Sequence, residues 1–114
     1  MEETLNNWLF ENAKTIAKNY VSAVVPMCKK FKIGKTGESL EDRKNQPDYS
    51  GTYNHIEEVY QSSSKDKVSE MEAYLIDEFE HLDKCMNKKD GDDSLKDTMA
   101  DASVYRAYVV WKES

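Results

Sequence analysis

The chain has 114 residues, a length that suits one domain, residues 1–114, around one hydrophobic core. Its net charge of −6 argues against strong non-specific binding to DNA, because such binding depends on basic side chains that neutralise phosphates. The two cysteines fit no metal-ligand spacing, and no long apolar run or signal-peptide pattern is present, so we expect an intracellular chain with free thiols and no membrane partner.

The first predicted element is an amphipathic helix over about residues 5–18, within the N-terminal segment 1–18. Its apolar residues recur at helical spacing and include Trp8, Leu9 and Ile16. We expect this apolar stripe to pack against the core. A helix that binds a partner is the alternative, and it is disfavoured because the stripe has only an ordinary width.

A strand is predicted next, at residues 20–25 (YVSAVV), because β-branched side chains are enriched there and Pro26 ends the run. Residues 30–33 alternate polar and apolar side chains, which is typical of a half-buried strand. The two segments are close enough to form a hairpin. Gly34 and Gly37 follow, and two glycines this close permit a turn that other residues disfavour.

The run Gly34–Thr36 looks like the end of a phosphate-binding P-loop, but that motif needs a glycine where this chain has Lys29. Ser39 is a good N-cap, so residues 40–46 are predicted to form a short helix. Pro47 stops that helix, because the residue before a proline avoids helical geometry. The result is a strand, a glycine turn and a helix start, an arrangement that can lie near an anion.

The second half predicts a strand at 55–60, the main helix at 68–83, a polar acidic loop at 88–102 and a strand at 104–111. The order of elements is therefore α-β-β-α-β-α-β. Adjacent strands near the start favour antiparallel pairing. We expect an α+β fold with a small sheet of three or four mainly antiparallel strands, flanked by helices.

Two charged residues stand out, although each also has an ordinary explanation. Glu72 falls on or beside the apolar face of the main helix, and a carboxylate there must be paired, hydrogen-bonded or bound to a metal. Arg43 lies close to the packed side of the short helix, and its planar fork suits phosphate. On spacing alone, a half-exposed Glu72 paired with a lysine and a surface Arg43 paired with an acid are favoured. A local basic patch, six basic against three acidic residues between Cys28 and Gln46, surrounds Arg43.

The segment FKIGKTGESLEDR, followed by VSEMEAYLIDEF, resembles the GIY-YIG nuclease superfamily. The similarity is greatest to the phage-derived branch, whose pattern is a tyrosine-rich strand, KIGKT, an arginine in a short helix and a helix that carries glutamate. It covers roughly residues 19–80 of this chain. The KIGKT-to-arginine part is fairly specific, and the glutamate helix is correctly placed.

The resemblance assigns roles position by position. Ile33–Gly34 matches the Ile-Gly pair of the second motif, and Lys32 stands where the superfamily usually has tyrosine. Arg43 matches the phosphate-contacting arginine, Glu72 the metal-binding glutamate, and Asn87 a downstream asparagine.

The first motif departs from the family pattern, because Asn19-Tyr20-Val21 stands where Gly-Ile-Tyr is expected and Tyr20 is out of register. The resemblance implies a DNA endonuclease that hydrolyses phosphodiester bonds, with Tyr20, Lys32 and Arg43 as catalytic residues. One Mg²⁺ or Mn²⁺ ion at Glu72 would act as Lewis acid. The residues expected to contact DNA are Lys30, Lys35, Thr36 and Lys44.

An inactive module that binds nucleic acid or a protein on the same fold is the alternative function. A geometric expectation separates the two. For hydrolysis, Arg43 and Glu72 should open onto one common cleft, close enough to share a phosphate and its ion, with a tyrosine pointing into it.

Overall fold

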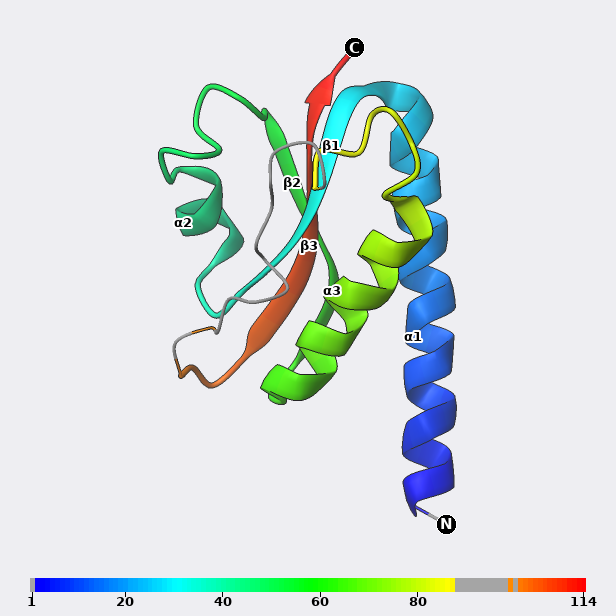
Figure 1. The fold of residues 1–114 in the computed structure, drawn as a ribbon. Helices are drawn as coiled ribbons and strands as arrows, with labels where there is room; N and C mark the ends of the chain where they lie inside the picture. The colour runs from blue at the N-terminus through cyan, green and yellow to red at the C-terminus, as the bar shows by residue number, and fades with distance from the viewer. Residues whose placement is uncertain (1, 88–98, 100) are drawn as a thin grey trace.

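The computed structural model describes residues 2–87, 99 and 101–114, and it has an α+β architecture (Figure 1). Its elements are α1 (Glu2–Val24), the 3₁₀ turn η1 (Val25–Met27), β1 (Cys28–Thr36), α2 (Leu40–Lys44), β2 (His55–Ser62), α3 (Lys65–Phe79) and β3 (Tyr105–Glu113). The predicted fold class is confirmed. Most of the predicted loop at 88–102 lies outside the described residues. None of the described helices is long and apolar enough to cross a membrane.

The sheet has three antiparallel strands in the order β1-β3-β2, so the last strand of the chain is the central one. In the register between β1 and β3, Gly34 lies opposite Tyr108 and Lys30 lies opposite Lys112. One face of the sheet carries α2, and the other carries α1 and α3 (Figure 1). These two faces hold different parts of the candidate site.

The outer edge of β1 is paired with the segment that follows α3. The N–H of Phe31 donates to the carbonyl of Lys84 at 2.9 Å, and the N–H of Met86 donates to the carbonyl of Phe31 at 2.9 Å. The buried amide of Asn87 accepts from the N–H of Ile33 at 2.9 Å and donates to its carbonyl at 2.7 Å. Asn87 therefore replaces a strand partner at this edge and provides hydrogen bonds to the N–H and the carbonyl of Ile33.

The predicted strand at 20–25 and its hairpin are wrong, because α1 continues through residues 20–24. Ala17, Val21 and Val24 are buried, and their spacing of four and three residues places them on one side of a helix. Burial of that side outweighs the β propensity of the valines. The 3₁₀ turn that contains Pro26 then redirects the chain into β1.

The side of α1 that packs on the core also differs from the prediction. Trp8 and Ile16 are exposed, at 60% and 67%, and Leu9 is exposed as well. Phe10 is buried instead, and it makes an edge contact with the ring of Tyr60 at a centroid distance of 5.6 Å. The N-terminal part of α1 extends beyond the sheet (Figure 1).

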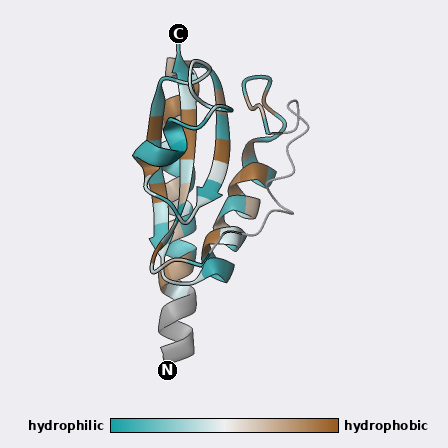
Figure 2. Ribbon diagram, turned by 90° about the vertical axis from the view of Figure 1, so that its left-hand side faces the viewer, coloured by the Kyte–Doolittle hydropathy of each residue, from teal (hydrophilic) through white to brown (hydrophobic). Residues whose placement is uncertain are grey.

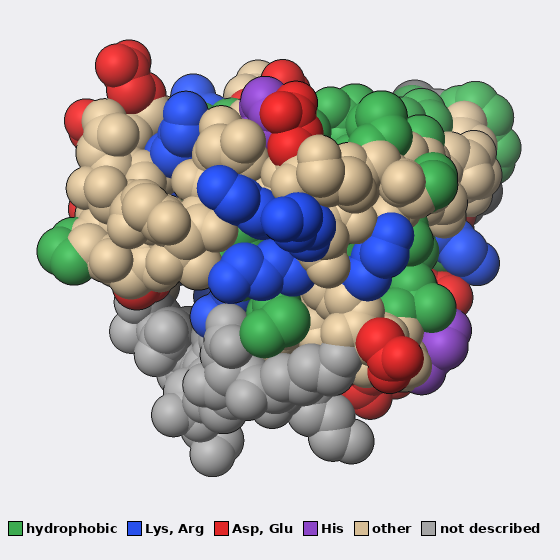
Figure 3. Space-filling model, turned by 90° about the horizontal axis from the view of Figure 1, so that it is seen from above, with side chains coloured by type: hydrophobic (Ala, Val, Ile, Leu, Met, Phe, Trp, Pro, Cys, Tyr) green, Lys and Arg blue, Asp and Glu red, His purple; other side chains and the backbone are tan. Residues whose placement is uncertain are grey.

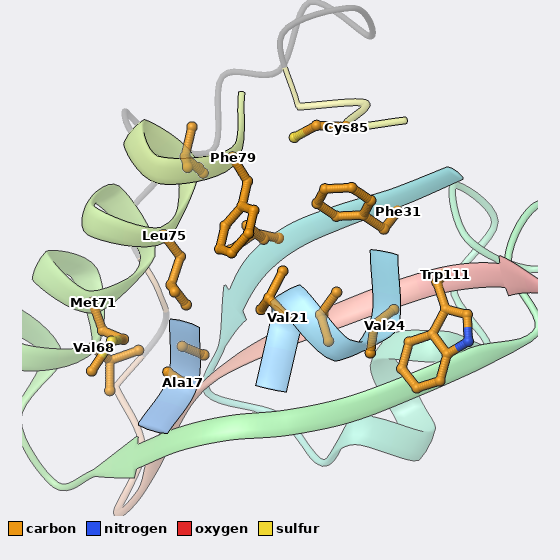
Figure 4. Packing of buried hydrophobic residues seen from close by; sticks show 14 of the residues in the cluster. Ala17, Val21, Val24, Phe31, Val68, Met71, Leu75, Phe79, Cys85 and Trp111 are labelled. Carbon is orange, nitrogen blue, oxygen red and sulfur yellow. The ribbon is translucent and has the colours of Figure 1, made fainter. Parts of the chain in front are cut away.

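Two hydrophobic clusters lie on the two faces of the sheet. The larger joins α1, α3 and the sheet, and Figure 4 shows its packing; it includes Val21, Phe31, Leu75 and Val109. The smaller lies between α2 and the sheet and contains Tyr49, Tyr53, Tyr108 and Val110, with Leu40 and Ile56 packed against them. Helix α2 is largely hydrophilic (Figure 2). The smaller cluster is therefore built mostly from tyrosines rather than from residues of α2.

Candidate functional site

Helix α2 places Arg43 over the tyrosine cluster. The hydroxyl of Ser39 accepts a hydrogen bond from the N–H of Asp42 at 3.2 Å, which confirms the predicted N-cap. Leu40 packs on the tyrosine cluster, and Arg43 lies one turn later on the same side of the helix. The helix ends at Lys44, slightly earlier than predicted.

Four side chains contact the guanidinium of Arg43. Its Nε donates to the hydroxyl of Tyr108 at 3.0 Å, and its two Nη atoms donate to the two carboxylate oxygens of Asp48 at 2.9 and 3.0 Å. Its Cζ lies 3.9 Å from the centre of the Tyr49 ring, a cation–π contact. Nη1 also donates to Gln46 at 2.6 Å. This arrangement fixes both the position and the plane of the guanidinium.

Tyr108 lies at the centre of this network, on the central strand. Its hydroxyl receives the bond from Arg43 and also shares a hydrogen bond of 2.8 Å with the hydroxyl of Tyr49. The ring occupies the space where a side chain at Gly34 would lie, since a β-carbon there would be only 2.5 Å from Cζ and 2.8 Å from Cε1. The glycine of the KIGKT motif is thus required for the close approach of Tyr108 to β1.

The ionisation of this network follows from its burial. Burial raises the pKa of Tyr108 to about 12, although the charge of Arg43 opposes part of that rise. Burial also raises the pKa of Tyr49. The hydrogen bonds from Arg43 lower the pKa of Asp48. At neutral pH the cluster therefore holds two neutral hydroxyls beside one guanidinium–carboxylate pair.

Glu72 reaches the same region from the other side of the sheet. It lies on α3, and its side chain has no exposed surface. Its Oε1 is 3.4 Å from the Nζ of Lys35, which also donates to Ser69 at 3.3 Å. The charge of Glu72 contributes to the raised pKa of Tyr108. Arg43 and Glu72 therefore act on the same hydroxyl from opposite faces.

Arg43 and Glu72 come from helices on opposite faces of the sheet and do not lie side by side. Glu72 is buried and paired with Lys35, and Arg43 is bound by Asp48. The two charged groups are not paired with each other, which agrees with the expectation. A tyrosine hydroxyl does lie between them, but it belongs to Tyr108.

Tyr20 does not lie at this site. It is on α1, 40% exposed, and α1 covers the sheet face opposite to α2. Burial, followed by the nearby charge of Glu57 on β2, raises the pKa of Tyr20. The reason for the correction is the helical conformation of residues 20–24, which removes the strand on which Tyr20 was expected to stand.

The lysines of β1 alternate between the two faces of the sheet. Lys32 lies opposite Val110, a member of the tyrosine cluster, so its side chain is on the α2 face. Lys30 lies on the same face, with its Nζ 5.4 Å from the centre of the Tyr53 ring. Lys35 points to the other face and is only 6% exposed, which argues against the predicted DNA contact.

The two other predicted DNA contacts differ in their exposure. Thr36 is buried at the end of β1, and its hydroxyl accepts a hydrogen bond from the N–H of Glu38 at 3.0 Å. That contact stabilises the turn into α2 and leaves Thr36 little surface for DNA. Lys44, in the last turn of α2 beside Arg43, is partly exposed.

A resident divalent ion does not fit the residues as they are arranged. The carboxylate of Glu72 already has a fixed cation, the ammonium of Lys35, and both groups are buried. A divalent ion beside the same carboxylate would be repelled by that ammonium. Mg²⁺ also needs several water or phosphate oxygens around it, for which a carboxylate with no exposed surface provides no access.

No family model, no curated protein and no solved structure matches this chain. The similarity to the GIY-YIG superfamily therefore rests on the motif residues described above. The spatial arrangement of the chain departs from the pattern of that superfamily in one respect. The strand that pairs with KIGKT and carries a tyrosine, β3, follows the motif in the chain instead of preceding it.

Proposed function

We propose that this chain binds the phosphate backbone of DNA, with Arg43 as the central contact, as a protein of GIY-YIG type. The observation that carries the proposal is the orientation of Arg43. Tyr49 supports one side of the guanidinium, Tyr108 holds Nε, and the two Nη atoms together bind two oxygens of Asp48. A phosphate group presents two oxygens in a similar geometry, which a planar guanidinium binds with both nitrogens.

Binding without catalysis is the form of this function that the geometry supports best. Glu72, the only metal ligand that the resemblance assigns, is buried against Lys35. Among the described residues, no group of three or more histidine, cysteine or acidic side chains could hold a metal ion. Arg43, by contrast, lies next to a carboxylate whose side chain is 56% exposed, so an incoming phosphate can compete for it.

A DNA endonuclease of GIY-YIG type is the second candidate, and the position of Tyr108 favours it. Tyr108 supplies a hydroxyl that is bonded to Arg43 and influenced by the charge of Glu72, which supports this candidate although the resemblance assigned the catalytic tyrosine to Tyr20. With its pKa raised to about 12, this hydroxyl remains protonated at neutral pH. This candidate requires Glu72 to exchange Lys35 for Mg²⁺ or Mn²⁺.

Two measurements on the same variants test the proposal. Fluorescence anisotropy with a labelled DNA oligonucleotide should show that Arg43→Ala loses most of the affinity, and that Arg43→Lys, which cannot bind two oxygens in a plane, regains only part of it. Equal affinity of wild type and Arg43→Ala would refute the proposed function.

Plasmid nicking with Mg²⁺ or Mn²⁺ then separates the two candidates. If wild type nicks the plasmid while Glu72→Gln and Tyr108→Phe do not, the chain is an endonuclease. If wild type binds DNA through Arg43 without nicking it, the chain is a binding module. Tyr20→Phe is the matched control, and it should behave as wild type in both assays because Tyr20 lies on the other face of the sheet.

A further inference from the structure

Two lysines face each other across the strand pair at the far end of the α2 face. Lys30 on β1 lies directly opposite Lys112 on the central strand. Lys112 is two residues beyond Val110, which belongs to the tyrosine cluster, so it shares that face. The contact of Lys30 with the Tyr53 ring places Lys30 there as well. Sequence alone did not connect these two residues.

Such a pair is unfavourable without an anion. Like charges directly opposite each other destabilise a pair of strands. In the part of the chain that the structure describes, neither Lys30 nor Lys112 forms an ion pair with a carboxylate. Basic side chains gather at the end of the molecule where β1 begins and β3 ends (Figure 3). An acidic chain therefore keeps concentrated positive charge at one place.

The pair also lies in line with Arg43. Arg43 bonds Tyr108, at the rung of Gly34; the next rung on this face carries Lys32 and the one after it carries Lys30 and Lys112. Two residues along a strand span about 6.6 Å, so the backbone positions of these rungs recur at roughly that interval along the face. A row of this kind matches a chain of phosphates better than a single small anion.

We propose that Lys30 and Lys112 together form a phosphate-binding pair that extends the Arg43 contact along the backbone of a nucleic acid. This inference rests on the proposed function and adds to it the direction in which the nucleic acid runs, from Arg43 past Lys32 toward the start of β1. It also adds Lys112, which lies outside the KIGKT region, to the residues that contact phosphate.

The salt dependence of binding to a DNA oligonucleotide tests the pair. The slope of log affinity against log salt falls by roughly 0.9 for each lost phosphate contact on duplex DNA, or 0.7 on a single strand. Lys112→Gln and Lys30→Gln should each reduce the slope by about one such step and weaken binding several-fold. Lys112→Arg should retain both values. Lys18→Gln on α1, which removes an exposed lysine from the other side of the molecule, should change neither.

The outcomes distinguish this inference from the proposed function. If Arg43→Ala weakens binding but Lys112→Gln leaves affinity and slope unchanged, Lys30 and Lys112 do not form a phosphate-binding pair, and the proposed function stands. If wild type does not bind the oligonucleotide, the proposed function is wrong, and an NMR titration with pyrophosphate decides the pair. Shifts at Lys30 and Lys112 that disappear in Lys112→Gln would support it, and no shift at either residue would overturn it.

The stability of the same variants provides a further test. Lys112→Gln removes the repulsion with Lys30, so its urea midpoint without anion should equal or exceed that of wild type. A lower midpoint would show that Lys112 stabilises the strand pair, and would overturn the interpretation of the pair as strained without a phosphate.

Discussion

The hydroxyl end of Tyr108 fills the space that a side chain at Gly34 would occupy, so the tyrosine and the glycine of KIGKT are complementary across two strands. Their strands come from distant parts of the chain. The contact explains how the central strand can bring a hydroxyl across β1 to Arg43. It also explains why this position needs a glycine even if the chain does not turn there.

Replacement of Gly34 with alanine should therefore disturb both stability and the site. The new β-carbon would force Tyr108 to move, and an overpacked core typically loses about 1–3 kcal/mol of unfolding free energy. Urea denaturation measures this loss. Gly51→Asn is the control, since Gly51 has φ +81° with no atom within 4 Å of the place where a β-carbon would lie, and asparagine tolerates that conformation. A loss in the control as large as that in Gly34→Ala would contradict the steric explanation.

Removal of the Tyr108 hydroxyl should lower both stability and DNA affinity without a steric clash. Tyr108→Phe keeps the ring but leaves Nε of Arg43 and the hydroxyl of Tyr49 without their shared partner, at a cost of about 1–3 kcal/mol. Tyr105→Phe is a matched control on the same strand, where the hydroxyl accepts from the backbone N–H of Ala102. Only Tyr108→Phe should also weaken DNA binding. Equal DNA affinity in wild type and Tyr108→Phe would show that the hydroxyl does not orient Arg43.

The raised pKa of Tyr108 predicts the alkaline limit of stability. In the unfolded chain this hydroxyl has an ordinary pKa near 10, and in the folded protein it has a pKa of about 12. The contribution of Tyr108 to stability is thus complete below pH 10 and is lost as pH rises from 10 through 12. Urea midpoints measured over this range should fall less steeply for Tyr108→Phe than for wild type. Parallel curves would mean that Tyr108 titrates normally in the folded state.

The buried pair of Lys35 and Glu72 should respond to single and double substitution in opposite ways. Lys35→Met or Glu72→Gln alone breaks the ion pair between these two buried groups, and breaking a buried pair costs about 3–5 kcal/mol. The double variant Lys35→Met/Glu72→Gln removes both charges and should recover part of that loss. A double-mutant cycle from urea unfolding gives the coupling. Additive losses would show that the pair contributes nothing as a pair.

Local signals allowed much of this architecture to be predicted. Ser39 marked the start of α2, and the spacing of apolar residues marked α3, because caps and periodicity act within a few residues. The predicted strand at 20–25 failed because tertiary burial of Val21 and Val24 overrode local propensity.

The site was harder to predict because its contacts join distant segments. Alternation along β1 separates Lys32 from Lys35, but only the packing of α2 and α3 decides which face each one meets. Arg43 and Tyr108 are 65 residues apart, and only the pairing of β3 with β1 brings them together. Residues close together in the sequence could therefore be predicted as a group, whereas the contact of Tyr108 with Arg43 could not.

Asp48 occupies the side of the Arg43 guanidinium that a phosphate would take. Both of its oxygens bind the guanidinium, and its side chain is 56% exposed, so water screens a pair that the bidentate geometry strengthens. Asp48→Asn removes the negative charge that competes with a phosphate while it keeps the shape of the side chain. We expect DNA affinity to rise several-fold, with a modest fall in the urea midpoint because one bidentate ion pair is lost. Asp42→Asn, which removes an acid from the adjacent helix α2, is the control for net charge. Weaker binding in Asp48→Asn would mean that Asp48 orients Arg43 for DNA instead of competing with it.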